Sequence, residues 1–129
     1  MQLLQTNTQL MLQRSMEYLW QKQTCILDNI ANVETPGYQV KYATFEDALN
    51  NALQETAGKS NTASSAALRQ AIAAPQVEIH QAEESVRADG NGVNITEQSV
   101  ELARNGYQQQ YVFNSISNEF TLLRTAIRG

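Results

Sequence analysis

Residues that could carry chemistry are scarce in this chain. It has one cysteine, Cys25, and one histidine, His80, among its 129 residues. A single cysteine excludes an intrachain disulfide, and one histidine would leave carboxylates to supply most of a zinc site. A serine–histidine–aspartate triad would have to use His80, and no nucleophile-elbow signature accompanies it. We therefore expect no catalytic residues, no metal site and no cofactor, and interpret the chain as a non-enzyme.

Charge and long apolar runs are also limited. Charged residues make up 17% of the sequence, and the formal net charge is -4, which argues against a nucleic-acid-binding protein with a basic face. No apolar run approaches the ~18 residues needed to cross a bilayer. The first residues also lack the basic start and apolar run of a secretory signal peptide. By these signals alone the protein is predicted to be cytoplasmic, with one domain.

The N-terminal section is predicted to be a long amphipathic helix. Apolar residues recur at spacings of three and four, which is a heptad seam interrupted once by Gln23. Trp20 and Leu27 widen this seam to the breadth of a core-facing stripe. The seam consists of Leu12, Met16, Leu19, Gln23, Ile26, Ile30 and Val33. A second row on another face, which the same partner helix cannot cover, consists of Leu4, Met11, Tyr18 and Cys25.

The C-terminal section repeats this pattern. Asn94 is a good N-cap, and Glu97 three residues later completes a capping-box-like pair. Val100, Tyr107 and Tyr111 lie off the seam and indicate a second contact surface. The seam, which is weak in its first half and strongly apolar in its second, consists of Ser99, Leu102, Gly106, Gln109, Phe113, Ile116, Phe120, Leu123 and Ile127.

Between the two helices, the stretch from Ile30 to Tyr38 is predicted to form a joint. Pro36 disfavours helical geometry at the preceding residue, so the first helix must stop at about Val33 or Glu34. Pro36 and Gly37 fit the central positions of a type II turn. After the turn, residues 38–43 alternate with the two-residue period of a strand.

The rest of the middle section is predicted to be short elements and a flexible segment. Thr44 is expected to cap a short helix that begins at Phe45, and residues 76–80 alternate like a strand. Residues 57–74 are rich in Ala, Ser and Asn, and we expect them to bury little and to be flexible. Residues 89–92 are predicted to form a turn, because the resemblance to a calcium loop fails at the later positions.

These patterns predict a mainly α fold, in which two long terminal helices pack as an antiparallel coiled-coil hairpin with a short extended and loop segment between them. The sections are 1–35, 36–93 and 94–129. The helices would be roughly 40 and 50 Å long, whereas a compact domain near this size is ~26 Å across. We therefore expect the second rows, together with the 36–56 segment, to bind other molecules.

Single residues leave some alternatives open. Cys25 is interpreted as a small hydrophobe and His80 as an ordinary strand histidine. Asn29 and Asn32 are poor helix formers, so they either terminate the helix or make amide hydrogen bonds to another molecule. Tyr107 and Tyr111 are interpreted as part of an interface or a core stripe rather than of a ligand face.

The motif at the end of the first helix closely resembles the N-terminal signature of bacterial flagellar rod and hook proteins, N-x-A-N-x-x-T-P-G-[YF]. Four further segments look like the corresponding segments of proximal rod proteins of the B type: residues 41–49, 89–94, 106–108 and 123–127. The resemblance covers roughly residues 10–55 and 88–129. The residues that match the signature are Asn29, Ala31, Asn32, Thr35, Pro36, Gly37 and Tyr38.

The resemblance implies a structural subunit of the proximal rod in the flagellar basal body. Such subunits polymerise through their terminal helices into a hollow tubular drive shaft, which transmits torque and encloses the export channel. It also implies export by the flagellar type III system without a cleaved signal peptide, and a place in the periplasm-spanning rod. The implied partners are copies of itself, other rod proteins, and the MS ring and export gate with their junction protein.

This resemblance leaves three other functions to consider. The first is a proximal rod subunit of the C type, whose signature usually carries more residues between its Asn and the Gly-Tyr pair. The second is a cytoplasmic helical adaptor or chaperone of flagellar export. The third is an enzyme such as a cell-wall hydrolase, for which His80 is the only conventional catalytic candidate.

Overall fold

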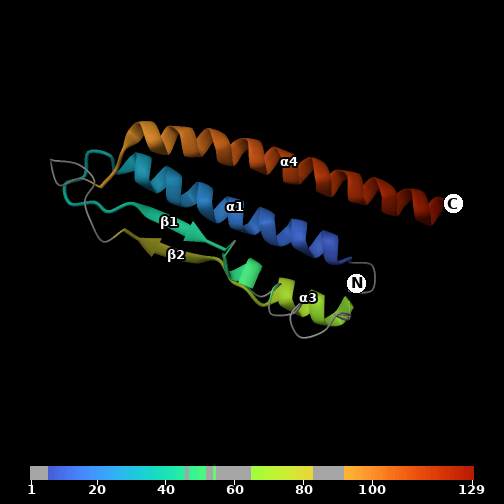
Figure 1. Ribbon diagram of the computed structural model, residues 1–129. Coiled ribbons are helices and arrows are strands. Elements are labelled where there is room, and N and C mark those ends of the chain that lie inside the picture. The colour runs from blue at the N-terminus through green and yellow to red at the C-terminus, as the bar shows by residue number, and fades with distance from the viewer. Residues whose placement is uncertain (1–5, 46, 52–53, 55–64, 83–91) are drawn as a thin grey trace.

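The computed structural model describes residues 6–45, 47–51, 54, 65–82 and 92–129. Its elements are α1 (Asn7–Ala31), β1 (Lys41–Thr44), α3 (Ser65–Ala73), β2 (Glu78–Gln81) and α4 (Ile95–Arg128). Helix α1 contacts α4, and it also contacts β1 and α3. Figure 1 shows α1 in the middle, with α4 on one side and the strands and α3 on the other. The fold is mainly helical, with packed terminal helices and a short two-stranded sheet, as predicted.

Helix α1 begins and ends at residues that satisfy its free backbone groups. The hydroxyl of Thr6 accepts a hydrogen bond from the backbone N–H of Gln9 at 3.1 Å. The side-chain oxygen of Gln9 accepts one from the N–H of Thr6 at 3.1 Å, which completes a capping box. The helix ends at Ala31 with Asn32 as C-cap, two to three residues earlier than predicted.

The predicted turn follows directly. The carbonyl of Thr35 accepts a hydrogen bond from the N–H of Tyr38 at 3.2 Å, and Gly37 has a φ of 74°. Both features are those of a type II turn with Pro36 and Gly37 at its centre. Strand β1 begins only at Lys41, later than predicted. Before it, the carbonyl of Tyr38 accepts from the N–H of Gly92 at 2.9 Å.

Strands β1 and β2 pair antiparallel, with Lys41 opposite Gln81 and Thr44 opposite Glu78. The prediction that Thr44 caps a helix is wrong, because its hydroxyl lies 2.9 Å from Nε2 of His80 on the neighbouring strand. A short helical segment does follow at residues 47–51. It starts with a hydrogen bond from the N–H of Leu49 to the carbonyl of Phe45, at 2.9 Å.

The prediction that residues 57–74 bury little is wrong for the part that the structure describes, and their flexibility stays a prediction. Residues 65–73 form α3, in which Ile72 is 2% exposed and Ala71 is buried. Alanine favours helix formation, and α3 contacts α1 and buries two apolar residues. Residues 57–64, and residues 89–91 of the turn predicted at 89–92, lie outside the described residues.

Helix α4 begins as predicted. The side-chain oxygen of Asn94 accepts hydrogen bonds from the N–H groups of Thr96 at 3.1 Å and Glu97 at 3.3 Å, so Asn94 is the N-cap. At 1.5 Å per residue, its 34 residues span about 51 Å. Helix α4 runs antiparallel to α1, and its C-terminal end extends beyond the start of α1 (Figure 1).

Both faces of α1 are covered within the chain. On the α4 side, Met16 and Leu19 form a buried cluster with Val112. On the opposite side, the ring of Tyr18 stacks on the ring of Phe45, with centroids 5.7 Å apart, and Cys25 is buried. The expectation that the second row of α1 would wait for another molecule is therefore wrong for these residues, because the chain folds its own middle section over them.

Candidate assembly interface

The predicted seam of α1 largely faces the interior. Met16, Leu19 and Ile26 are buried, and Leu12 and Ile30 are half-buried. The predicted widening of this seam by Trp20 and Leu27 is wrong, because their exposed fractions are 60% and 47%. Both residues therefore lie outside the packed stripe and do not widen it.

The predicted seam of α4 is only partly the one that contacts α1. Leu102, Ile116 and Leu123 are half-buried, whereas the predicted seam residues that are more than 60% exposed are Phe113, Phe120 and Ile127. The buried residues of α4 are Gln98, Asn105 and Val112. Each of them lies one residue before a predicted position. The role of the exposed seam residues in assembly stays a prediction.

Polar side chains make much of the contact between α1 and α4. The amide nitrogen of Asn105, which is 1% exposed, donates to the backbone carbonyl of Leu19 at 3.1 Å. The amide of Gln109 donates to the side-chain oxygen of Gln23 at 2.8 Å. Sequence reasoning missed Asn105 because a hydrophobic pattern gives no weight to amides, although the two amides Gln98 and Asn105 lie one heptad apart.

Asn29 forms a junction of three elements, which we call the Asn29 junction. Its amide nitrogen donates to the carbonyl of Lys41 at 2.8 Å and to the side-chain oxygen of Gln98 at 2.9 Å. Its oxygen accepts from the N–H of Lys41 at 2.8 Å and from the hydroxyl of Tyr38 at 3.3 Å. All four hydrogen-bonding positions of the amide are used. Asn29 therefore bonds within its own chain, which neither of the two predicted roles anticipated.

The other motif residues shape the backbone around that junction. Asn32 ends α1, and its amide nitrogen donates to the carbonyl of Asp28 at 2.8 Å. The hydroxyl of Thr35 donates to the side-chain oxygen of Asn32 at 3.1 Å. The side chains of Ala31 and Pro36, like Gly37, are exposed. The helix-termination alternative is thus the one that the structure supports for Asn32.

Burial and charge act on two groups near the Asn29 junction. Burial of the Cys25 thiol, reinforced by the nearby Asp28 carboxylate, raises its pKa above 9.0. The same two causes raise the pKa of the Tyr38 hydroxyl above 10.0. Both groups therefore stay protonated near neutral pH, and Cys25 is packed as the small hydrophobe that the sequence predicted.

His80 contacts side chains of its own two-stranded sheet. Its Nε2 lies 3.5 Å from a carboxylate oxygen of Glu78, and its ring stacks on Tyr42 with centroids 5.4 Å apart. The described residues hold no group of three or more metal-ligating side chains. None of the helices in this part of the chain is both long and apolar enough to span a membrane.

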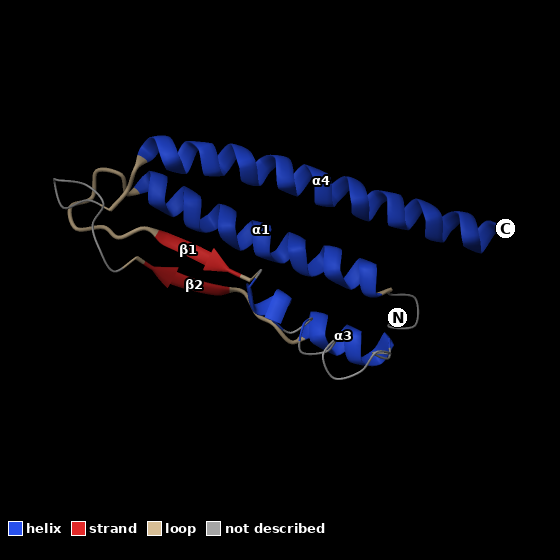
Figure 2. Ribbon diagram, in the orientation of Figure 1, coloured by secondary structure: helices blue, strands red, loops and turns tan. Residues whose placement is uncertain are grey.

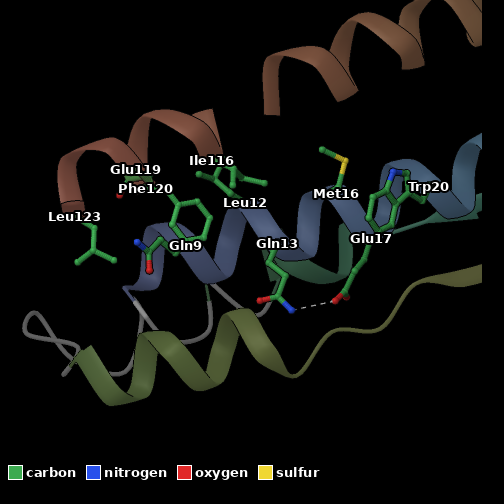
Figure 3. A pocket seen from close by; sticks show the side chains of 10 residues that line it. All are labelled: Gln9, Leu12, Gln13, Met16, Glu17, Trp20, Ile116, Glu119, Phe120 and Leu123. Atoms are coloured by element: carbon green, nitrogen blue, oxygen red, sulfur yellow. Dashed lines mark hydrogen bonds between the residues drawn. The ribbon is translucent and has the colours of Figure 1, made fainter. Parts of the chain in front are cut away.

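An open groove, which we call the end groove, lies between the N-terminal half of α1 and the C-terminal half of α4 (Figure 3). It has a volume of about 590 Å³, and Trp20 and Phe120 remain largely exposed beside it. Its apolar lining consists of Leu12, Met16, Trp20, Ile116, Phe120 and Leu123. Its polar lining consists of Gln9, Gln13, Glu17 and Glu119.

A second groove, of about 680 Å³, lies on another side of α4. Tyr18, Phe45 and Leu49 line one wall, and Tyr107 and Tyr111 of α4 line the other. The two α4 tyrosines are 75% and 73% exposed. Their role in a second contact surface stays a prediction.

Known proteins with a similar sequence were found. Flagellar basal body rod protein FlgB of Salmonella typhimurium is 26% identical over 116 residues, which cover 84% of this chain and 84% of that protein. Flagellar basal body rod protein FlgB of Bacillus subtilis is 24% identical over 108 residues, which cover 84% of this chain and 83% of that protein. No family model matches the chain.

The fold defines a class of protein, a helical hairpin with a small β-containing middle section and large apolar side chains exposed along its terminal helices. Within that class, the chain resembles the flagellar basal-body rod proteins of the FlgB type. The similarity runs over most of both chains, and it confirms the resemblance predicted from the motif around Asn29.

Proposed function

We propose that this chain is a structural subunit of the proximal rod of the bacterial flagellar basal body. In this proposal its terminal helices polymerise into a hollow shaft that transmits torque and encloses the export channel. The similarity to two FlgB rod proteins over most of the chain supports a structural role in the rod. Both relatives bear the name of a rod protein, which favours a structural role over a catalytic one.

One observation carries this proposal beyond the similarity. The second half of α4 leaves four large apolar side chains more than 60% exposed: Phe113, Phe120, Leu122 and Ile127. Burying one such side chain is worth roughly 1.5–3 kcal/mol. Exposed apolar surface on a helix that extends beyond its own partner is the arrangement expected of a subunit completed by its neighbours.

The proposed setting follows from that role. The partners would be copies of this chain, other rod proteins, and the MS ring and export gate with their junction protein. The protein would reach the periplasmic rod through the flagellar type III export apparatus. The long helices would then pair with those of neighbouring subunits, and only in the assembly would their apolar faces be fully buried.

Isolation of basal bodies from the bacterium that encodes this chain tests the proposal. A strain lacking the gene should be non-motile, and a tagged copy should restore swimming and co-purify with detergent-extracted basal bodies. Immunogold labelling should place the tag at the rod. A tagged copy that restores motility but stays in the soluble fraction would instead support an adaptor or chaperone of export.

A second arm separates the structural role from a catalytic one. His80 is the only conventional catalytic candidate, and it lies on a strand between Tyr42 and Glu78. A His80→Gln variant should therefore swim normally and enter basal bodies in normal amounts. Loss of motility with normal incorporation would favour an enzyme and would contradict the proposed role.

A further inference from the structure

We infer that the end groove binds the C-terminal end of α4 from a second copy of this chain, so that unlike surfaces of neighbouring copies meet. The inference rests on the proposed function, and it adds which two surfaces meet and why they are complementary. The occupying segment comprises residues 124–128, with Ile127 entering the apolar groove.

The end groove has the chemistry of a receptor for an apolar and basic helix end. Six of its lining side chains are apolar, and none of the ten is basic. Two carboxylates, Glu17 and Glu119, lie among the lining residues. Glu17 pairs with Arg14 at 2.7 Å, whereas Glu119 has no ion pair within the part of the chain that the structure describes.

The end of α4 has the opposite chemistry. Ile127 is 71% exposed, and Arg124 and Arg128 flank it along the helix. Neither arginine makes an ion pair with any of the described residues. No acidic side chain occurs between Phe120 and Gly129. A segment with one exposed isoleucine between two arginines therefore matches an apolar groove edged by carboxylates, and desolvated charge pairs would fix its orientation.

The two surfaces adjoin on α4, because the groove lining ends at Leu123 and the occupying segment begins at residue 124, but they share no residue. This difference determines the kind of assembly. A contact between unlike patches is heterologous, so each copy still offers a free groove and a free helix end after the first contact. Such contacts produce open helical arrays rather than closed dimers unless the rotation closes a ring. Figure 1 shows the start of α1 and the end of α4 at the same end of the hairpin, and the groove is lined by the halves of the two helices nearest that end. Neighbouring copies would therefore be staggered.

Cysteine cross-linking inside the cell tests the contact. Two differently tagged copies are co-expressed in the strain lacking the gene, one with Gln13→Cys at the groove and one with Ile127→Cys. A short bismaleimide should give a cross-linked heterodimer in purified basal bodies. The native Cys25 is buried and should not react. The matched control replaces the second copy with Asn114→Cys, an exposed α4 position that is not part of the groove lining, and should give no heterodimer.

The outcomes separate this inference from the proposed function. If both copies enter basal bodies but no heterodimer forms, or if the Gln13→Cys copy is linked only to another rod protein, the inference fails and the rod role stands. If neither copy enters basal bodies, and a tagged wild-type chain does not enter them either, both ideas fail. A heterodimer that forms with the Ile127→Cys copy and not with the Asn114→Cys control supports the inference.

Charge reversal tests the complementarity itself. In the cross-linking pair, Arg124→Glu on the helix-end copy should abolish the heterodimer band, because it places like charges together. Adding Glu119→Lys to the groove copy should restore the band. The heterodimer band can recover only if residues 119 and 124 meet between copies. If either change acts only by disturbing the fold, the double variant will still give no band, and that result would overturn the inference.

Discussion

Asn29 near the end of α1 donates a hydrogen bond of 2.9 Å to Gln98 in the first turns of α4. Both side chains are buried, with exposed fractions of 1% and 7%. The bond joins residues that are 69 positions apart in sequence. Because Asn29 also bonds both backbone groups of Lys41, one side chain fixes α1, α4 and β1 relative to one another.

The first prediction concerns Asn29 itself. Asn29→Ala would leave Gln98 and the backbone of Lys41 without their buried partner, so it should lower the free energy of unfolding by about 3 kcal/mol. Asn29→Asp should also destabilise, because a carboxylate cannot donate to the Lys41 carbonyl. Urea unfolding followed by circular dichroism measures both. The exposed Asn118→Ala is the control and should change stability by less than about 0.5 kcal/mol.

Alkaline pH should destabilise the protein through Cys25 and Tyr38. The folded state raises the pKa of both groups, so above the ordinary value of 9.0 for the thiol the unfolded chain loses its proton first. The unfolding free energy is therefore constant below pH 9 with respect to these groups and falls as pH rises further. Cys25→Ala should make that fall less steep. If the slope of unfolding free energy against pH between pH 8 and 10 were the same in Cys25→Ala as in the wild type, Cys25 would not be a cause of the fall.

Two glycines should respond in opposite directions to alanine. Gly37 has a φ of 74°, and an added Cβ would meet nothing within 4 Å, so Gly37→Ala should cost about 1 kcal/mol through the backbone alone. Gly106 lies inside α4 with equally open space, so Gly106→Ala should stabilise by about 0.5–1 kcal/mol. Thermal unfolding of the two variants under one condition measures both. Equal shifts in one direction would contradict the left-handed turn.

Arg14 should hold the middle section against α1. Its guanidinium donates to the carbonyl of Pro75 and lies 5.5 Å from the ring centre of Phe45. Arg14→Ala should therefore speed hydrogen exchange in α3 and β2 by about tenfold, the equivalent of about 1.4 kcal/mol. Amides in α4 should be unaffected. Arg104→Ala, which removes a more exposed arginine, is the matched control.

The sequence predicted the elements well where a local rule was enough. Pro36 and Gly37 fix a turn because one has no N–H and a fixed φ and the other accepts positive φ. Asn94 caps α4 because its short side chain reaches the free N–H groups of the first turn. Both predictions depend on neighbours a few residues away.

The burial pattern between α1 and α4 was predicted less well, for a physical reason. Val112 and Phe113 are adjacent, so a helical pattern fits either, and only the packed partner decides which one is buried. Asn105 and Gln98 have amide side chains, so a search for apolar residues leaves them out. They can still be buried, because a carbonyl or amide on α1 satisfies their hydrogen-bonding groups. The roles of Phe113, Phe120 and Ile127 outside the monomer stay predictions.

Local chemistry along the chain was thus sufficient for two long helices, the Asn94 cap and the turn at Gly37, because propensity and hydrogen bonding within a few residues depend on sequence alone. Tertiary structure decided which face of each helix is buried, and it turned Asn29 from a helix breaker into the junction of three elements. Those outcomes depend on contacts between residues far apart in the sequence, and a local pattern does not show which distant residues will meet.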